Sequence, residues 1–270
     1  MMALIKDFQF KEKYDFYDLV EIMRILRAPE GCPWDSVQTH ESIKKNFIEE
    51  TYEVVEAINK KDSALLCEEL GDVMMQVVFH AEIEEENNAF DVGDVTDGVC
   101  KKLIERHPHI FSDTQVGGVD DVLTNWDAIK KATKNQKSQT ESMLSVPREL
   151  PALMRSEKIQ EKAAKSGFDW DSIEPVFEKT QEELEELKLA VSEGSPENTE
   201  EELGDLLFSV VNLSRFLSCD AEDCLTKATD KFIRRFSSVE EIAKERNINM
   251  KNASLQELDK LWDEVKSKGE

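Results

Sequence analysis

Closely spaced carboxylates are the residues of this 270-residue sequence that are best suited to chemistry. Each half of the chain carries glutamates three and four residues apart, followed 20 residues later by a Glu and an Asp three apart. Side chains at these spacings share one face of a helix. The residues are Glu49, Glu50, Glu53, Glu69 and Asp72 in the first half and Glu182, Glu183, Glu186, Glu202 and Asp205 in the second.

Antiparallel packing of the two helices in each half would bring these carboxylates face to face. Like charges at close range repel, and some of the acids take up protons unless a cation holds them. Oxygen ligands suit Mg2+, or Mn2+ in its place, better than zinc. The sequence therefore predicts a divalent-metal site in each half, although a Glu-rich helix face is also typical of plain solvent exposure.

The surroundings of the Glu–Asp pair favour a positioned site. In each half the pair lies among leucine, valine and other apolar residues rather than on a uniformly polar helix. The glycine between Glu and Asp, Gly71 or Gly204, costs about 1 kcal/mol relative to alanine inside a helix. Such a glycine indicates either the close approach of a neighbour or ordinary helix packing.

The formal net charge of −24 restricts the substrates that such a site can take. Nucleic-acid polymers are bound mainly through basic patches, so DNA and RNA are not expected partners. A small phosphate-bearing substrate needs cations that are placed locally. Lys231 and Arg235, one helical turn apart, can point together at a phosphate, and Lys102 and Arg106 repeat their spacing in the first half.

Further basic and aromatic residues are candidates for contact with such a substrate. Lys266 lies one turn beyond Trp262, and Trp126 and Lys130 repeat this pair in the first half. Each tryptophan is compatible with a core position or with stacking on a base. Lys179 precedes the second run of glutamates by three residues.

The same motifs recur in one order in both halves, so the sequence is a tandem duplication of one helical unit. The offset between matched residues stays between 129 and 136. The repeats also include Trp34-Asp35-Ser36, which matches Trp170-Asp171-Ser172. One position differs, because Asn46 stands where the second half has Lys179. This difference puts the activity of the first half in question.

Helical periodicity runs through most of the chain, and no run of alternating β-branched residues indicates a strand. We therefore predict an all-α fold with two helical domains, 1–132 and 151–270, joined by a polar linker at 133–150. The short connections between acidic helices force neighbours to run antiparallel. These helices are predicted at 42–59 and 63–86 in the first half, and at 173–192 and 199–218 in the second.

The composition predicts a cytoplasmic protein that does not associate with membranes. The N-terminal segment mixes charged with apolar residues, and no stretch is long enough to cross a bilayer. The 5 cysteines are widely spaced and form no CxxC motif, so neither a disulfide framework nor a thiolate zinc site is expected.

The ordered set of motifs resembles the two-domain MazG nucleoside triphosphate pyrophosphohydrolases. Gly31-Cys32-Pro33-Trp34-Asp35 and Arg106-His107-Pro108-His109 look like parts of the first domain of that family. Pro151-Ala152-Leu153-Met154-Arg155 and Gly167-Phe168-Asp169-Trp170 look like the start of the second domain. The similarity covers nearly the whole chain after the N-terminal segment, and its specificity comes from the order of the motifs.

The resemblance implies helices that form a four-helix bundle around Mg2+, assembled as a homodimer. It also implies hydrolysis of ribo- and deoxynucleoside triphosphates with a broad range of bases, ATP included, to monophosphate and pyrophosphate, which clears non-standard nucleotides. All the carboxylates named above would then be metal ligands, with Glu183 and Glu186 as catalytic residues and Glu183 as the first candidate for orienting the attacking water. The nucleotide-binding residues would be Lys179, Lys231, Arg235, Trp262 and Lys266, with Lys102, Arg106, Trp126 and Lys130 in the first half.

Three alternatives fit parts of the pattern. A di-iron oxygen enzyme uses Glu-x-x-His pairs, but none of the 4 histidines follows a glutamate by three residues. A hydrolase specialised for an alarmone or for one modified nucleotide would share the metal chemistry, and only substrate profiling separates it. A non-catalytic helical module would bind nucleotide or a protein partner without turnover, and this reading suits the first half better than the second.

Overall fold

The computed structural model describes residues 8–112, 117–118, 121–122, 125–126, 129 and 138–268. Throughout these ranges every regular element is helical, which confirms the predicted all-α class. The chain divides into two compact units, Met1–Lys130 and Lys131–Glu270. In the part of the chain that the structure describes, no helix combines the length and the apolar character needed to cross a membrane.

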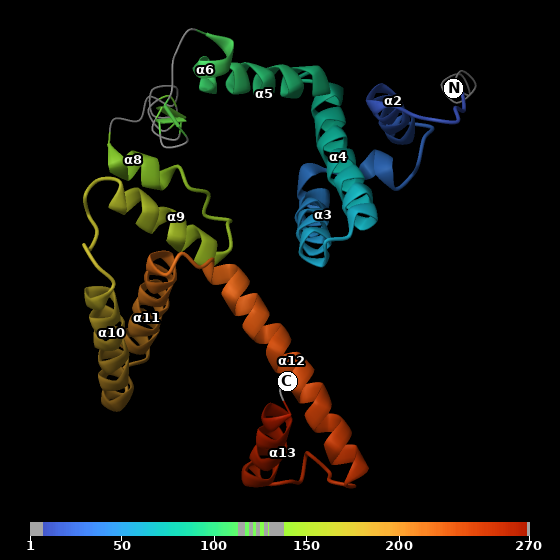
Figure 1. Cartoon of the computed structure of the whole chain (residues 1–270). Coiled ribbons are helices and arrows are strands. Elements are labelled where there is room, and N and C mark those ends of the chain that lie inside the picture. The colour runs from blue at the N-terminus through green and yellow to red at the C-terminus, as the bar shows by residue number, and fades with distance from the viewer. Residues whose placement is uncertain are drawn as a thin grey trace. The chain divides into compact units, whose positions relative to one another are not determined.

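The first unit is built on two long antiparallel helices, α3 (His40–Lys60) and α4 (Ser63–Glu86) (Figure 1). A shorter helix, α2 (Phe16–Arg27), packs on α4. The other elements of this unit are the 3-10 helix η1 (Asp35–Val37), α5 (Val92–Arg106) and α6 (Pro108–Phe111).

The buried core of the first unit lies where α2 crosses the α3–α4 pair. Val20 and Met23 on α2 meet Ile43 on α3 and Val78 and Phe79 on α4. These residues occupy the start of α3 and the second half of α4, away from the turn that joins the two helices. The acidic motifs lie nearer that turn, so they are positioned by the core without being part of it.

The turn between α3 and α4 is two residues long. Lys61 ends α3 in the left-handed conformation, with a φ of 56°, and Asp62 caps α4 by accepting hydrogen bonds from its first backbone N–H groups. The observed helices depart from the predicted 42–59 and 63–86 only at the ends of α3, because the Thr39 side chain caps that helix earlier than expected.

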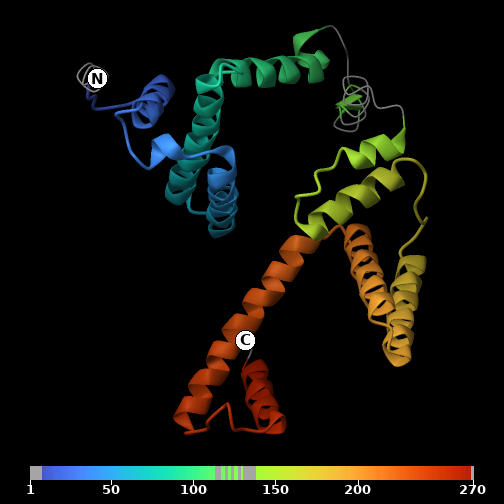
Figure 2. The ribbon, with the colours of Figure 1, turned by 180° about the vertical axis from the view of Figure 1, so that it is seen from behind.

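The second unit repeats this pair as α10 (Glu174–Glu193) and α11 (Pro196–Phe216), which lie side by side in both views (Figures 1 and 2). Gly194 ends α10 with a φ of 69°, and the Ser195 side chain caps α11. Helix α9 (Ala152–Ala164) packs on α11. The acids of this half therefore have the same helical framework as those of the first.

A long helix, α12 (Ala221–Glu245), leads away from the α10–α11 pair and carries α13 (Leu255–Ser267) on its far end (Figures 1 and 2). Apolar residues of α12 and α13 form their own core, which consists of Val239, Ile242, Ala243, Leu261 and Val265. The α10–α11 pair and the α12–α13 pair of this unit are therefore separate, and they do not close into one bundle within the single chain.

The segment between the two halves contains a helix that the sequence does not predict. Helix α8 (Gln139–Leu144) lies inside the predicted linker, 133–150, and the Ser138 side chain caps it. Residues 133–137 of that linker lie outside the described ranges. A short helix of mostly polar residues and a linker have similar compositions, so sequence composition alone does not separate them.

Candidate functional site

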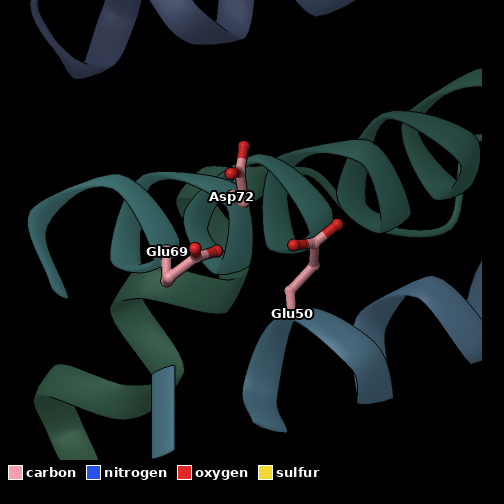
Figure 3. A group of neighbouring side chains, drawn as sticks. All are labelled: Glu50, Glu69 and Asp72. Atoms are coloured by element: carbon pink, nitrogen blue, oxygen red, sulfur yellow. The ribbon is translucent and has the colours of Figure 1, made fainter. Parts of the chain in front are cut away.

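The acidic helices of the first unit bring three carboxylates together. Glu50 on α3 faces Glu69 and Asp72 on α4 (Figure 3). One oxygen from each carboxylate lies within 4.8 Å of the others, and all three residues are half-buried. Because α3 and α4 run antiparallel, the middle of one helix is held opposite the first turns of the other, and the two acidic motifs meet.

Burial and neighbouring carboxylates both favour the protonated form of two members of this group. Burial raises the pKa of Glu50, and a hydrogen bond with Glu53 and the charge of Asp72 raise it further. Burial also raises the pKa of Glu69, with the charge of Glu53 as the next cause. Carboxylates that favour the protonated form because of their neighbours are the arrangement that a divalent cation neutralises.

The second unit holds an equivalent group between α10 and α11. Oxygens of Glu183, Glu186 and Glu202 lie within 4.8 Å of one another. Glu183 is only 7% exposed, whereas Glu186 lies at the surface. Burial raises the pKa of Glu202, and the charges of Glu186 and Asp205 add to the effect. Two members match between the halves, Glu50 with Glu183 and Glu69 with Glu202, whereas the third carboxylate is Asp72 in the first group and Glu186 in the second.

Lysine 179 distinguishes the second group from the first. The ammonium of Lys179 lies 2.8 Å from Glu182 and 2.9 Å from Glu183. The pKa of Lys179 is raised, because Glu182 and then Glu183 accept hydrogen bonds from it. Asn46 holds the corresponding place on α3, so the first group has no cation at this point. A resident cation thus offsets part of the acidic charge in the second unit.

The remaining predicted ligands surround these two groups. Glu53 hydrogen-bonds with Glu50, and Asp205 is close enough to Glu202 to raise its pKa. Glu49 and Glu182 are exposed, and Glu182 is held by Lys179. The structure thus brings three carboxylates of each half within mutual reach of one ion, and places the others at the border of the group.

The predicted cations of the second unit lie on the other pair of helices. Lys231 is exposed and Arg235 is half-buried on α12, and Lys266 on α13 lies 3.9 Å from Asp263. Since α12 diverges from α10 and α11, and α13 lies at its far end, the helices that carry these residues lead away from the acidic pair of their own unit (Figures 1 and 2).

Trp262 packs inside its own helical pair. Its ring centroid lies 5.2 Å from that of Phe232 on α12, and Trp262 borders the core formed by α12 and α13. The half-buried environment indicates that packing accounts for at least part of the role of this residue. Part of the side chain remains accessible to solvent.

The structure describes three of the four residues that are predicted to bind nucleotide in the first unit. Lys102 is exposed and Arg106 is half-buried in the last turn of α5. Trp126 is half-buried and meets the His107 ring edge-on at 5.2 Å. Lys130 lies outside the described residues.

The expectation of a close neighbour beside the helix-interior glycines is wrong for the single chain. Among the described residues, no atom lies within 4 Å of the position that a Cβ would occupy at Gly71 or Gly204. Both glycines face open space instead. The surface beside these glycines is therefore accessible to another molecule. Sequence periodicity within one chain does not reveal this accessibility.

Sequence analysis also missed a histidine network in the first unit. His40 Nδ1 lies 2.7 Å from His80 Nδ1, and His40 Nε2 lies 2.6 Å from a Glu84 oxygen. These contacts tie the start of α3 to the second half of α4. The four-residue spacing of His80 and Glu84 on one helix was a signal for it, because residues at this spacing share a face.

Comparison with known proteins assigns both acidic groups to one domain type. The profile of the MazG nucleotide pyrophosphohydrolase domain matches residues 38–111 and residues 172–240. Each matched range contains one three-carboxylate group, its flanking acids and one Lys/Arg pair. The duplication predicted from the motifs is therefore confirmed as two copies of this domain.

Full-length relatives agree with the domain match. The nucleoside triphosphate pyrophosphohydrolase/pyrophosphatase MazG of Thermotoga maritima is 47% identical over 251 residues, which are 93% of this chain and 95% of that protein. The nucleoside triphosphate pyrophosphohydrolase of Escherichia coli K12 is 43% identical over 92% of this chain and 95% of its own length. An uncharacterized Bacillus subtilis protein, YabN, is 47% identical over 94% of this chain, which covers 52% of that protein.

Proposed function

The chain belongs to the MazG nucleotide pyrophosphohydrolase family, and from this premise we propose that it hydrolyses nucleoside triphosphates to monophosphate and pyrophosphate with Mg2+. The substrates are ribo- and deoxynucleotides with a broad range of bases, and the biological role is removal of unwanted nucleotides from the pool. The observation that carries this proposal is the pair of three-carboxylate groups, one in each matched domain.

The donor chemistry of both groups fits Mg2+. Each offers three carboxylate oxygens within 4.8 Å of one another, and burial, with the charges of neighbouring carboxylates adding to it, raises the pKa of Glu50, Glu69 and Glu202. In the second unit Glu183 and Glu186 would be the other ligands, with further carboxylates at the border of the group. Bound Mg2+ neutralises phosphate charge and lowers the pKa of a coordinated water, and Mn2+ accepts the same ligands.

Different residues of the chain then act on the attacking water and on the leaving pyrophosphate. Glu183, buried at the centre of its group, orients the attacking water and accepts its proton, with Glu186 beside it. The water oxygen bonds to the α-phosphorus, and the bond from that phosphorus to the bridging oxygen breaks. Lys231 and Arg235 neutralise the negative charge on the departing pyrophosphate.

A homodimer supplies these cations under the proposal. Helix α12 leads away from the acidic helices α10 and α11 of its own unit, so under this proposal the cations that complete their site, Lys231 and Arg235, come from a second copy. Exposed apolar residues support such an interface, since Phe232 and Ile233 on α12 are 55% and 59% exposed and Leu207 on α11 is 52% exposed. Burying such side chains against another chain is favourable.

We also propose that the enzyme works in the cytoplasm. Cys67, Cys100, Cys219 and Cys224 are free and exposed. Exposed thiols persist in the reduced state in the cytosol, where glutathione and thioredoxin maintain them. The proposed nucleotide substrates belong to the same compartment.

The direct test is to incubate the purified chain with ATP, GTP, CTP, UTP, deoxynucleotides and ITP, with and without Mg2+, and to resolve all products. Metal-dependent monophosphate plus pyrophosphate is the expected result. Diphosphate plus orthophosphate would place the cut at the wrong bond. Turnover of a single modified nucleotide would favour a specialised hydrolase, and binding without turnover would favour a non-catalytic module.

A further inference from the structure

Two of the 5 cysteines lie at one junction of the second unit. Helix α11 ends at Phe216 and α12 begins at Ala221, so residues 217–220 connect the two helices. Cys219 belongs to this connection, and Cys224 lies in the first part of α12. Both thiols are free and exposed. No step of the proposed hydrolysis uses this junction.

The backbone of the junction is held by the end of one helix and the cap of the next. Ser218 adopts the left-handed conformation with a φ of 54°, and the Cys219 N–H donates to the Ser214 carbonyl at 2.9 Å. These features are typical of a Schellman ending, here of α11. The Asp220 side chain caps α12 by accepting a hydrogen bond from the Asp223 N–H at 2.8 Å. Cys219 therefore has a fixed position between the two helices.

This arrangement places the two thiols against each other. Cys219 directly precedes the cap residue Asp220, and Cys224 is the fourth residue of α12. Side chains at these two positions of a helix start contact each other in a hydrophobic staple. Here both are thiols, and a side-chain hydrogen bond joins Cys224 to Cys219. A disulfide needs two cysteines that face each other at short range, and this pair meets that requirement.

The duplication identifies what the two thiols replace. At the offset that relates Lys231 to Lys102, Asp91 caps α5 as Asp220 caps α12. The residues at the two staple positions of α5 are Phe90 and Val95. The first unit thus has an apolar pair where the second has two cysteines, so the redox chemistry of this position belongs to the second unit alone.

The surroundings suit the two thiols to different steps. Partial desolvation raises the pKa of Cys224, and the charge of Cys219 and the hydrogen bond with it add to the rise. The thiolate is the nucleophile in thiol chemistry, so Cys224 is poorly suited to a first attack on an oxidant. Its contact with Cys219 suits it instead to react with that sulfur once it has been oxidised.

We propose that Cys219 and Cys224 are a redox modification site, at which hydrogen peroxide converts the two thiols into a reversible intramolecular disulfide. The Cys219 thiolate attacks one peroxide oxygen, the O–O bond breaks, and a sulfenic acid and one water form. The Cys224 sulfur then attacks the sulfenic sulfur, the S–O bond breaks, and the hydroxyl leaves with the Cys224 proton as a second water. Two thiols are thereby oxidised, and one peroxide is reduced to two waters.

The local charge favours an uncharged oxidant. Asp220 and Asp223 lie between the two cysteines, and the whole chain has a formal net charge of −24. Such a surface repels anionic disulfides such as oxidised glutathione, whereas hydrogen peroxide is neutral. A dithiol reductant such as thioredoxin returns the pair to two thiols. Disulfides of cytosolic proteins are typically transient ones of this kind, which fits the compartment proposed above.

The test is mass spectrometry of the full chain after treatment of the reduced protein with hydrogen peroxide and alkylation of the remaining thiols. Trypsin cuts after Arg215 and Lys227, and the peptide between these cuts contains Cys219 and Cys224 and no other cysteine. The disulfide is therefore expected as this one peptide, without alkyl groups and lighter by two hydrogens. Because the resolving thiol is held in place, this form should account for at least about nine tenths of the oxidised Cys219. Treatment with dithiothreitol should restore alkylation.

Cys224→Ser tests the roles of the two thiols, and Cys67→Ser, which removes an exposed thiol of the first unit, is the matched control. Without Cys224 the sulfenic acid on Cys219 is expected to persist and to react with dimedone, whereas Cys67→Ser leaves the disulfide unchanged.

Three results would overturn the site: oxidation of Cys219 mainly to sulfinic acid in the unaltered chain, a disulfide that joins two copies, or equal dimedone labelling with and without Cys224→Ser. Formation of the disulfide by oxidised glutathione but not by hydrogen peroxide would overturn the assignment of the oxidant. None of these measurements depends on nucleotide hydrolysis, so the proposed function stands or falls separately.

Discussion

Two neighbouring glutamates on α10 differ in their surroundings, because one carboxylate is held within the acidic group and the other is solvated. Glu183 is buried within the three-carboxylate group, whereas Glu182 is exposed and lies outside it. Both contact Lys179, at 2.9 and 2.8 Å. The difference between them is therefore their position relative to the acidic group rather than their shared cation.

This pair gives the first prediction. In the Glu53→Ala background, Glu183→Gln lowers kcat for ATP at least about 100-fold, because general-base catalysis contributes a factor of that order. Glu182→Gln in the same background lowers kcat less than about fivefold. Pyrophosphate release under saturating ATP measures both. Equal losses for the two variants would contradict the role given to Glu183.

Glu82 gives a prediction about stability and pH. It is 8% exposed, and burial raises its pKa to about 7, with the charge of Glu85 adding to the rise and Arg24, 3.6 Å away, opposing it. The folded chain then binds a proton at Glu82 that the unfolded chain releases near 4.5. The resulting stability is complete below pH 4.5 and is lost as pH rises through about 7.

The measurement is denaturant unfolding at pH 5.5 and pH 8. In the wild type, Glu82 lowers the free energy of unfolding by about 1–2 kcal/mol between these two pH values, a size limited by solvent screening of the neighbouring charges. In Glu82→Gln this part of the decrease is absent. Glu56→Gln, an exposed substitution on α3, is the matched control and leaves the pH dependence unchanged. An unaltered pH dependence in Glu82→Gln would contradict the assignment.

At the scale of the elements, the two acidic hairpins differ in the residue that ends their first helix. Lys61 and Gly194 both adopt the left-handed conformation, with φ of 56° and 69°. This conformation strains a residue with a Cβ but not glycine. The two hairpins thus carry the same turn at different conformational cost.

Exchanging these residues gives a prediction with opposite signs. Gly194→Lys destabilises the second unit by about 1 kcal/mol, because it introduces a side chain at a left-handed position. Lys61→Gly relieves strain in the first unit, although the greater freedom of glycine in the unfolded chain reduces the gain below that value. Urea unfolding followed by circular dichroism measures both, and changes of the same sign would rule out this explanation.

The acidic helices were predictable because their signals are local. Helical periodicity and turn residues predicted α3, α4, α10 and α11 to within a few residues, and the short turns predicted that their acids would meet. The positions of α12 and α13 depend on contacts between distant segments, which no periodicity within one helix reveals. The burial of the Gln160 Oε1 atom, to which no group donates among the described residues, is hidden for the same reason, since it depends on α9 packing against α11.

At the scale of the whole molecule, separation of charges within one chain is the main feature. The second unit has its acids on α10 and α11 and its Lys231/Arg235 pair on α12, which leads away from them (Figures 1 and 2). The open space beside Gly204 and the exposed apolar residues of α12 fit a second copy. A symmetric dimer would complete each site with residues of both chains.

Complementation between two inactive variants tests this assembly. Glu183→Gln and Lys231→Ala, each in the Glu53→Ala background, are inactive separately under the proposal. In mixed dimers one site combines the intact acids of one copy with the intact cations of the other. Mixed dimers isolated by co-expression with two affinity tags therefore have about one half of the activity of the parent, since one of their two sites is complete. No gain over the separate variants would exclude sites shared between copies.

The most direct test of the central claim measures Mg2+-dependent pyrophosphate release from ATP by a double variant, Glu53→Ala with Glu186→Ala. Its matched control is Glu56→Ala with Glu185→Ala, which removes exposed, ion-paired glutamates from the same two helices. The acidic groups account for hydrolysis if the first variant loses at least about 100-fold in kcat and the control stays near the wild type. Unchanged turnover in the first variant would show that hydrolysis takes place elsewhere.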